Sequence, residues 1–238
     1  MDVPTTYIDV SYSTARTAFS AKKLLDKISE YPVIACDLEI AVKYTPEQLS
    51  EWQALLDSGT LSKAEASPYL SKVKATALDH PSHCTITHCS IAISESQSYV
   101  FILDNKSITD YVLNFLVTTK QKQIWHNLSF DARFLQYFTG KLPYDFEDSQ
   151  ILAKCLINHV NTFKAKTGLK ELAGHMYGSW GISKDNFDIA HMYDEHVLRY
   201  AAIDSCATYY IYDYMMKECD AIDAKIIAST TIDWEAPY

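Results

Sequence analysis

Two acidic residues stand inside an apolar run early in the chain. Residues 33–40 read Val-Ile-Ala-Cys-Asp-Leu-Glu-Ile, and a continuous apolar run of this kind is typical of a strand covered on both faces. Side chains two residues apart on a strand point to the same face, so Asp37 and Glu39 stand side by side, about 7 Å apart at the backbone. Two uncompensated carboxylates there cost on the order of several kcal/mol each, which favours a bound cation. An edge strand with solvated charges is the alternative.

Two later segments carry further acids in apolar surroundings. Asp131 ends the string His-Asn-Leu-Ser-Phe-Asp and falls in the first turn of a predicted helix that follows a strand. An acid there also stabilises the helix dipole, so Asp131 alone indicates capping as readily as metal binding. Tyr200 and Asp204 lie four residues apart on a predicted helix and therefore share one of its faces. This pair carries little weight alone in a chain with 17 tyrosines, because a helical aspartate is commonly solvated.

Taken together, four carboxylates from three segments are what a two-metal phosphoryl-transfer site requires. Mg²⁺ and Mn²⁺ are hard cations that take oxygen ligands, and two of them roughly 4 Å apart need several. One cation activates a water while the other stabilises the leaving 3′ oxygen. The sequence therefore predicts a site for two divalent cations, Mg²⁺ or Mn²⁺.

The elements that must position these residues mix strands and helices, which predicts one α/β domain with a mixed central sheet. The predicted strands cover residues 7–10, 33–40, 84–93, 99–103 and 124–126. The predicted helices cover residues 20–31, 108–118, 127–138, 148–157, 169–177 and 196–216. Ser20 caps the first helix and Asp148 the fourth. Residues 41–82 do not continue the apolar strand pattern of the segments on either side, and they contain the helix start Thr45-Pro46. We therefore interpret them as a helical insertion.

Composition fits an ordinary globular protein. At 238 residues with 48% hydrophobic residues, the chain can bury a sizeable core. It has no apolar run near the ~20 residues that span a bilayer, and its start does not resemble a signal peptide. We therefore expect a soluble, cytoplasmic protein without a membrane partner. The net charge of −9 argues against a nucleic-acid partner, but bound cations reverse the local field.

The cysteines do not indicate a zinc site. The six cysteines form no CxxC pair. The string His83-Cys84-x-x-x-His88-Cys89 lies on a predicted strand, whose alternation splits these side chains between two faces. No second ligand pair follows at zinc-finger spacing.

Three motifs, in order along the chain, resemble those of the DEDD superfamily of 3′→5′ exonucleases. They are Asp-x-Glu at residues 37–39, Asn-x-x-Phe-Asp at residues 127–131 and Tyr-x-x-x-Asp at residues 200–204. The tyrosine is typical of the branch marked by Tyr rather than His. The surrounding strings are similar to the proofreading domain of family A (polymerase I-like) DNA polymerases, particularly phage ones. The resemblance covers residues 33–40 and about 84–216, roughly three quarters of the chain.

The resemblance implies a ribonuclease H-like fold and assigns roles to individual residues. It implies four metal ligands, Asp37, Glu39, Asp131 and Asp204. Tyr200 would orient the attacking water, with Glu39 helping from the other side. Four further residues would lie near the terminal nucleotide: Asn127, Leu38, Ile40 and Phe130, although a core role fits Phe130 better. The implied reaction releases 5′-mononucleotides from the 3′ end of single-stranded DNA. The implied protein is a monomer associated with a DNA polymerase, in the host cytoplasm if phage-encoded.

The chain also departs from the family's pattern. Ile40 stands where relatives often have Thr, which removes a hydroxyl near the substrate but no ligand, and the insertion 41–82 lies outside the family's minimal core. Residues 1–216 would form the exonuclease domain, and residues 217–238 a tail or linker toward a polymerase module. A fragment and a stand-alone enzyme both fit.

Two other functions stay open. An RNA 3′-exonuclease of the ribonuclease D kind uses the same motifs and metals, and the sugar preference is not readable from sequence. A binding module without activity is the third alternative, although all four ligands are present. Lys170 belongs to a small basic run that fits a phosphate contact or a solvated surface equally well.

Overall fold

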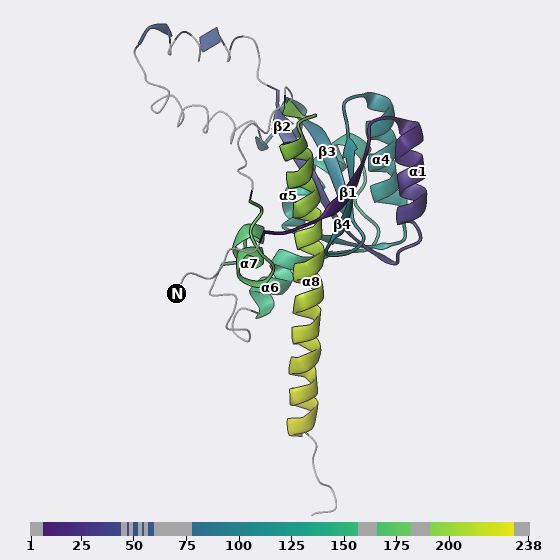
Figure 1. Cartoon of the computed structure of the whole chain (residues 1–238), viewed down its shortest axis with the longest axis vertical. Helices are drawn as coiled ribbons and strands as arrows, with labels where there is room; N and C mark the ends of the chain where they lie inside the picture. Colours follow the sequence, from purple (N-terminus) through teal and green to yellow (C-terminus); the bar gives the residue numbers. More distant parts are fainter. Residues whose placement is uncertain are drawn as a thin grey trace, which may run out of the picture.

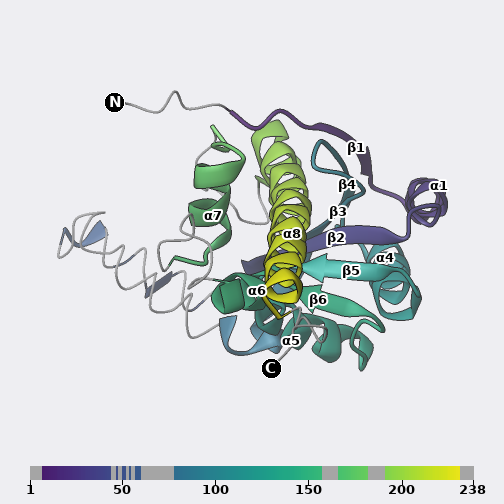
Figure 2. The same cartoon turned by 90° about the horizontal axis from the view of Figure 1, so that it is seen from below.

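The computed structural model describes residues 7–43, 78–156, 166–181 and 191–230, with a few positions between 47 and 59. In these ranges a mixed six-stranded sheet carries helices on both faces (Figure 1, Figure 2). The strands are β1 (Ser11–Ala15), β2 (Val33–Val42), β3 (Cys84–Ala92), β4 (Gln97–Ile102), β5 (Lys122–Trp125) and β6 (Phe146–Asp148). The helices are α1 (Ala18–Ile28), α4 (Lys106–Thr118), α5 (Leu128–Thr139), α6 (Ser149–Leu156), α7 (Leu169–Met176) and α8 (Glu195–Thr230), with the 3-10 helix η1 (Pro81–His83). The predicted α/β fold with a mixed central sheet is confirmed.

The strand with the two acids lies inside the sheet. The strand order is β1-β4-β3-β2-β5-β6, and β2 pairs antiparallel with β3 and parallel with β5. Asp37 lies opposite Ser90, and Glu39 lies opposite His88 just before a register shift. The apolar run around the acids is therefore that of a covered strand, and the edge-strand alternative is wrong.

Two hydrophobic layers cover the sheet. One layer packs α1, α4 and α5 against residues of β2 such as Cys36 and Leu38. The other packs α8, with α6 and α7 beside it, against the opposite face, where β2 contributes Ala35. Because side chains alternate along a strand, Asp37 and Glu39 share the face of Ala35 and lie on the α8 side.

Helix α8 is longer than predicted. It has 36 residues and ends at Thr230, whereas the sequence pattern predicted an end at residue 216. Figure 1 shows that its last part extends past the sheet, although Cys219 and Ile222 are still partly buried against the hydrophobic layer on this face. An ion pair one turn apart joins Asp213 and Lys217 at 2.6 Å and supports the helix there. No helix among the described residues is long and apolar enough to cross a membrane.

The N-terminal segment differs from the prediction in two places. Residues 7–10 do not form a strand, although Ile8 and Val10 are buried; Tyr7 makes a single bridge to Ser179, and the paired strand β1 begins at Ser11. The cap of α1 is Thr17 rather than Ser20. The two residues form a reciprocal capping box in which Ser20 is the third helical residue.

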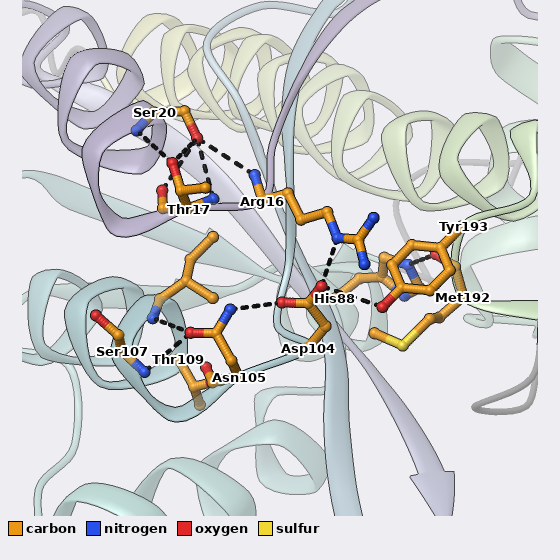
Figure 3. Close-up of polar contacts among 11 residues, drawn as sticks. Arg16, Thr17, Ser20, His88, Asp104, Asn105, Ser107, Thr109, Met192 and Tyr193 are labelled. Atoms are coloured by element: carbon orange, nitrogen blue, oxygen red, sulfur yellow. Dashed lines mark hydrogen bonds and ion pairs between the residues drawn. The ribbon is translucent and has the colours of Figure 1, made fainter.

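A polar cluster fixes the beginning of α8 to the sheet (Figure 3). Arg16 Nε lies 2.5 Å from Asp104 Oδ2, and the Tyr193 hydroxyl donates to the same oxygen at 3.0 Å. The Arg16 guanidinium also stacks 4.0 Å from the centre of the Tyr193 ring. The buried His88 ring bonds the Met192 carbonyl at 2.7 Å. These contacts hold the chain just before α8 beside β3 and β4.

The predicted helical insertion, residues 41–82, lies largely outside the described residues. Its ends are described: β2 continues to Val42, which pairs with Cys84 at the start of β3. The Lys43 amide donates to the His83 carbonyl at 2.8 Å. The insertion therefore connects two neighbouring antiparallel strands.

Candidate active site

Three of the predicted ligands meet between β2 and α8. Asp37, Glu39 and Asp204 each offer one carboxylate oxygen, and these oxygens lie within 4.8 Å of one another. Glu39 and Asp204 are 6% and 7% exposed, and Asp37 is half-buried. Among the described residues this is the one group of three or more histidine, cysteine, aspartate and glutamate side chains at such distances.

Asp131 lies close by but outside this 4.8 Å group. It occupies the first turn of α5 and is 4% exposed. Burial raises the pKa of the Asp131 carboxyl well above its ordinary value, and the charge of Glu39 raises it further. Backbone hydrogen bonds from Asp131 itself and from Leu38 act in the opposite direction. Its Oδ1 atom is buried and accepts no hydrogen bond from the described residues.

This donor set fits divalent cations. Four carboxylates, three of them almost fully buried, supply only oxygen ligands, which Mg²⁺ and Mn²⁺ prefer. Without a counter-charge the cluster is costly, because like charges at short range disfavour ionisation. The raised pKa of Asp131 and its buried Oδ1 atom are the direct signs of this cost.

Tyr200 shares the site as a protonated phenol. It lies one turn before Asp204 on α8 and is 2% exposed. Burial raises the pKa of the Tyr200 hydroxyl, and the charges of Asp204, Glu39 and Asp37 raise it further, together with a hydrogen bond to Asp204. The hydroxyl therefore keeps its proton at neutral pH. Its one proton lies in the hydrogen bond to Asp204, so its oxygen can accept from a water molecule and orient it, but it does not serve as a base.

Small residues and one buried hydrogen bond set the position of α8 on the sheet. Ala201 and Ala202 are fully buried, so the helix backbone can approach closely. The hydroxyls of Ser205 and Ser98 on β4 are 2.8 Å apart and fully buried. Because Ser205 directly follows Asp204, this bond fixes the depth at which the α8 carboxylate enters the site.

Asp148 orients the helix that carries Asp131. Its carboxylate accepts from the Gln150 amide at 2.8 Å, which confirms its predicted role as the cap of α6. It also accepts from the Asn127 and Leu128 amides at 3.0 and 2.8 Å, at the start of α5. Sequence analysis missed this second role, because the contact depends on the parallel pairing of β5 with β6, which the sequence pattern does not show.

The residues predicted near the terminal nucleotide lie in different places. Leu38 is 4% exposed and its side chain packs in the core on the face opposite the carboxylates, so only its backbone reaches the site. Ile40 and Phe130 are half-buried against the same core, and the Phe130 ring lies 5.2 Å from that of Phe134. Asn127 is half-buried in a left-handed conformation (φ 63°) just before α5, where its side chain makes no cap.

Two residues that sequence analysis did not assign touch the site. The Trp180 indole N–H donates a hydrogen bond to Asp204 Oδ1. The Lys170 ammonium on α7 lies 4.5 Å from the centre of the Tyr200 ring. The small basic run that contains Lys170 was a weak signal for the second residue, and the sequence carried no signal for Trp180.

A mixed sheet whose central strand and flanking helices bring four carboxylates and a tyrosine together defines a cation-dependent nuclease site. The sequence profile of a family described as 3′-5′ exonuclease matches residues 69–220. The chain therefore belongs to the 3′-5′ exonuclease family, and this family uses divalent metal ions. The match begins after Asp37 and Glu39, which the pairing of β2 with β3 joins to the matched part. No curated protein matches the chain.

Solved structures share the fold at low sequence identity. NrnC of Brucella melitensis, solved with pGG, is 14% identical with a TM-score of 0.60, covering 90% of this chain and 84% of that one. Escherichia coli RNase D is 15% identical with a TM-score of 0.54, covering 89% and 46%. The catalytic core of RRP6 from Trypanosoma brucei is 12% identical with a TM-score of 0.54, covering 90% and 50%. The ribonuclease H-like exonuclease fold is thereby confirmed.

Proposed function

We propose that this chain removes 5′-mononucleotides from the 3′ ends of single-stranded or frayed DNA, as a proofreading exonuclease does. The observation that carries the proposal is the meeting of Asp37, Glu39 and Asp204 within 4.8 Å, with Asp131 beside Glu39. Two divalent cations, Mg²⁺ or Mn²⁺, would supply charge for the phosphodiester, the attacking water and the leaving 3′ oxygen.

The protein's own residues divide the remaining tasks. The four carboxylates hold the cations, and the protonated Tyr200 hydroxyl orients the attacking water, with Glu39 on its other side. The water attacks the last phosphorus in line with the bond to the 3′ oxygen. That bond breaks, a 5′-mononucleotide leaves, and the shortened strand keeps a 3′ hydroxyl. Asn127 would line the site at the end of the strand.

Two considerations bear on the sugar. The motif strings typical of family A polymerases support DNA. RNA is the second candidate, because the fold neighbours include Trypanosoma brucei RNase D in complex with RNA U12, 13% identical with a TM-score of 0.53, and NrnC bound to pGG.

Digestion of 5′-labelled DNA and RNA oligonucleotides of one sequence tests the proposal. With Mg²⁺ or Mn²⁺ we expect a ladder that shortens from the 3′ end of DNA. The ladder should be absent with EDTA and with Asp131→Ala. Faster digestion of RNA would replace DNA by the ribonuclease alternative. Absence of a ladder on both, with wild-type protein and either metal, would contradict an exonuclease.

The proposal extends to the setting of the enzyme. A chain with a net charge of −9 binds a phosphate backbone weakly, so we propose that a DNA polymerase delivers the strand to a monomeric, cytoplasmic exonuclease. Excision of a mismatched primer end should then be faster with a polymerase present than without it. Light scattering should give the mass of one chain, 27.0 kDa.

A further inference from the structure

Trp180 makes a side-chain contact with one of the carboxylates. It follows α7 in the chain, is 5% exposed, and donates its indole N–H to Asp204 Oδ1 on α8. An indole is a donor only, so the direction of this bond is fixed. Hydrogen bonds to a carboxylate are stronger than neutral ones. Fixing one oxygen also fixes the rotation of the carboxylate, and therefore the direction in which its other oxygen points.

The backbone around Trp180 is held from the opposite side. The Ile8 amide donates to the Ser179 carbonyl at 2.9 Å, where Tyr7 forms its bridge. Gly181 has a φ of +65°, and a Cβ atom there would lie 2.7 Å from the Tyr7 ring. A side chain at Gly181 would be strained by this backbone conformation even if the exposed Tyr7 ring moved away. The N-terminal segment thus holds the backbone of residues 179–181 in place, and the hydrogen bond from Trp180 holds the Asp204 carboxylate relative to it.

We propose that Trp180 is a positioning residue that sets the orientation of Asp204 and thereby the affinity of the site for divalent cations. The inference rests on the proposed function only in the identity of the cation, because the carboxylate cluster exists without it. Partners that orient metal ligands typically contribute 10–100-fold to metal affinity or activity. We expect the contribution of Trp180 to Mn²⁺ affinity to lie at the lower end of this range, about tenfold, because Tyr200 also bonds Asp204.

The test compares two tryptophan substitutions of the same kind. Trp180→Phe keeps an aromatic ring but removes the N–H donor together with part of the bulk of the indole. Trp125→Phe on β5 is the matched control, because Trp125 is fully buried and its indole N–H finds no partner among the described residues. Mn²⁺ binding to the whole chain is measured by titration calorimetry, and melting is measured in EDTA and with Mn²⁺.

We expect Trp180→Phe to weaken Mn²⁺ binding about tenfold and to reduce the Mn²⁺-induced rise in melting temperature. Trp125→Phe should bind Mn²⁺ within about twofold of wild type, whatever its effect on stability in EDTA. If Trp180→Phe does not fold, Gly181→Ala perturbs the same segment through its left-handed backbone conformation and should also weaken Mn²⁺ binding. Equal Mn²⁺ affinity of wild type and the folded Trp180 or Gly181 variant would overturn the inference.

The same measurements separate this inference from the proposed function. Weaker Mn²⁺ binding by Trp180→Phe, with no digestion of any strand by the wild type, would retain the positioning role and remove the exonuclease. Digestion by the wild type, with unchanged Mn²⁺ affinity in the variant, would retain the exonuclease and remove the positioning role of Trp180. A wild-type chain that binds no Mn²⁺ at millimolar concentration would overturn both.

Discussion

Replacing Asp131 by asparagine should stabilise the metal-free protein and abolish its activity. Asparagine has nearly the shape of aspartate but no charge. Asp131 is 4% exposed, faces the charge of Glu39, and has an Oδ1 atom that accepts no hydrogen bond from the described residues. The substitution therefore removes a buried charge that its backbone hydrogen bonds offset only in part, as the raised pKa of Asp131 shows.

The size and the pH dependence of this effect follow from the site. A buried polar group without a partner costs about 1–3 kcal/mol, and more when it is charged. In a chain of this length 1 kcal/mol shifts the melting temperature by about 2–4 °C, so we expect a rise of roughly 2–10 °C in EDTA. Because the pKa of Asp131 is raised from 3.8, wild-type stability is lost as pH rises above that value. The gain should be larger at pH 8 than at pH 5.

Scanning calorimetry in EDTA and in Mn²⁺ measures both parts of this prediction. At a hundredfold excess over the dissociation constant, Mn²⁺ should stabilise the wild type by about 2.7 kcal/mol and the variant by less. Asp104→Asn is the control with the opposite sign. Burial alone would raise the pKa of Asp104, but hydrogen bonds led by that from Arg16 lower it. If Asp131→Asn lowered the melting temperature in EDTA as Asp104→Asn should, the Asp131 charge would already be compensated and the reasoning would be refuted.

Three further predictions follow from single residues. Burial lowers the pKa of His126 from 6.5 to about 4. The neutral His126 ring therefore contributes about 3 kcal/mol to the free energy of unfolding above pH 6.5, and this contribution is lost as pH falls through 4. In urea titrations, His126→Asn should lose less stability than the wild type on acidification. Tyr200→Phe should lower kcat about 100-fold at saturating Mn²⁺, since it removes the hydroxyl that orients the attacking water; an unchanged kcat would exclude the orienting role. Lys170→Met should raise KM for a single strand and flatten its salt dependence by about 0.7 in log–log slope, as loss of one phosphate contact does; an unchanged slope would leave Lys170 as a solvated residue.

The local parts of the site could be predicted from sequence, and the contacts across elements could not. Strand alternation places Asp37 and Glu39 on one face, and the same rule places Leu38 on the other, which the family resemblance obscured. Helical spacing pairs Tyr200 with Asp204. The hydrogen bond from Trp180 to Asp204 joins residues 24 positions apart on different elements, so helix and strand periodicity could not predict it. The end of α8 was missed because residues 217–225 include no fully buried residue, so the sequence has little apolar periodicity there.

The connection between β2 and β3 explains how a long insertion can interrupt this site without disturbing it. Val42 pairs with Cys84, and Lys43 bonds His83, so the insertion leaves and re-enters the sheet at adjacent positions. The register of β2 is set by its pairing with β3 and β5, which the insertion does not interrupt. Asp37 and Glu39 therefore keep their positions opposite α8, although they lie before residue 69, where the match to the exonuclease family begins.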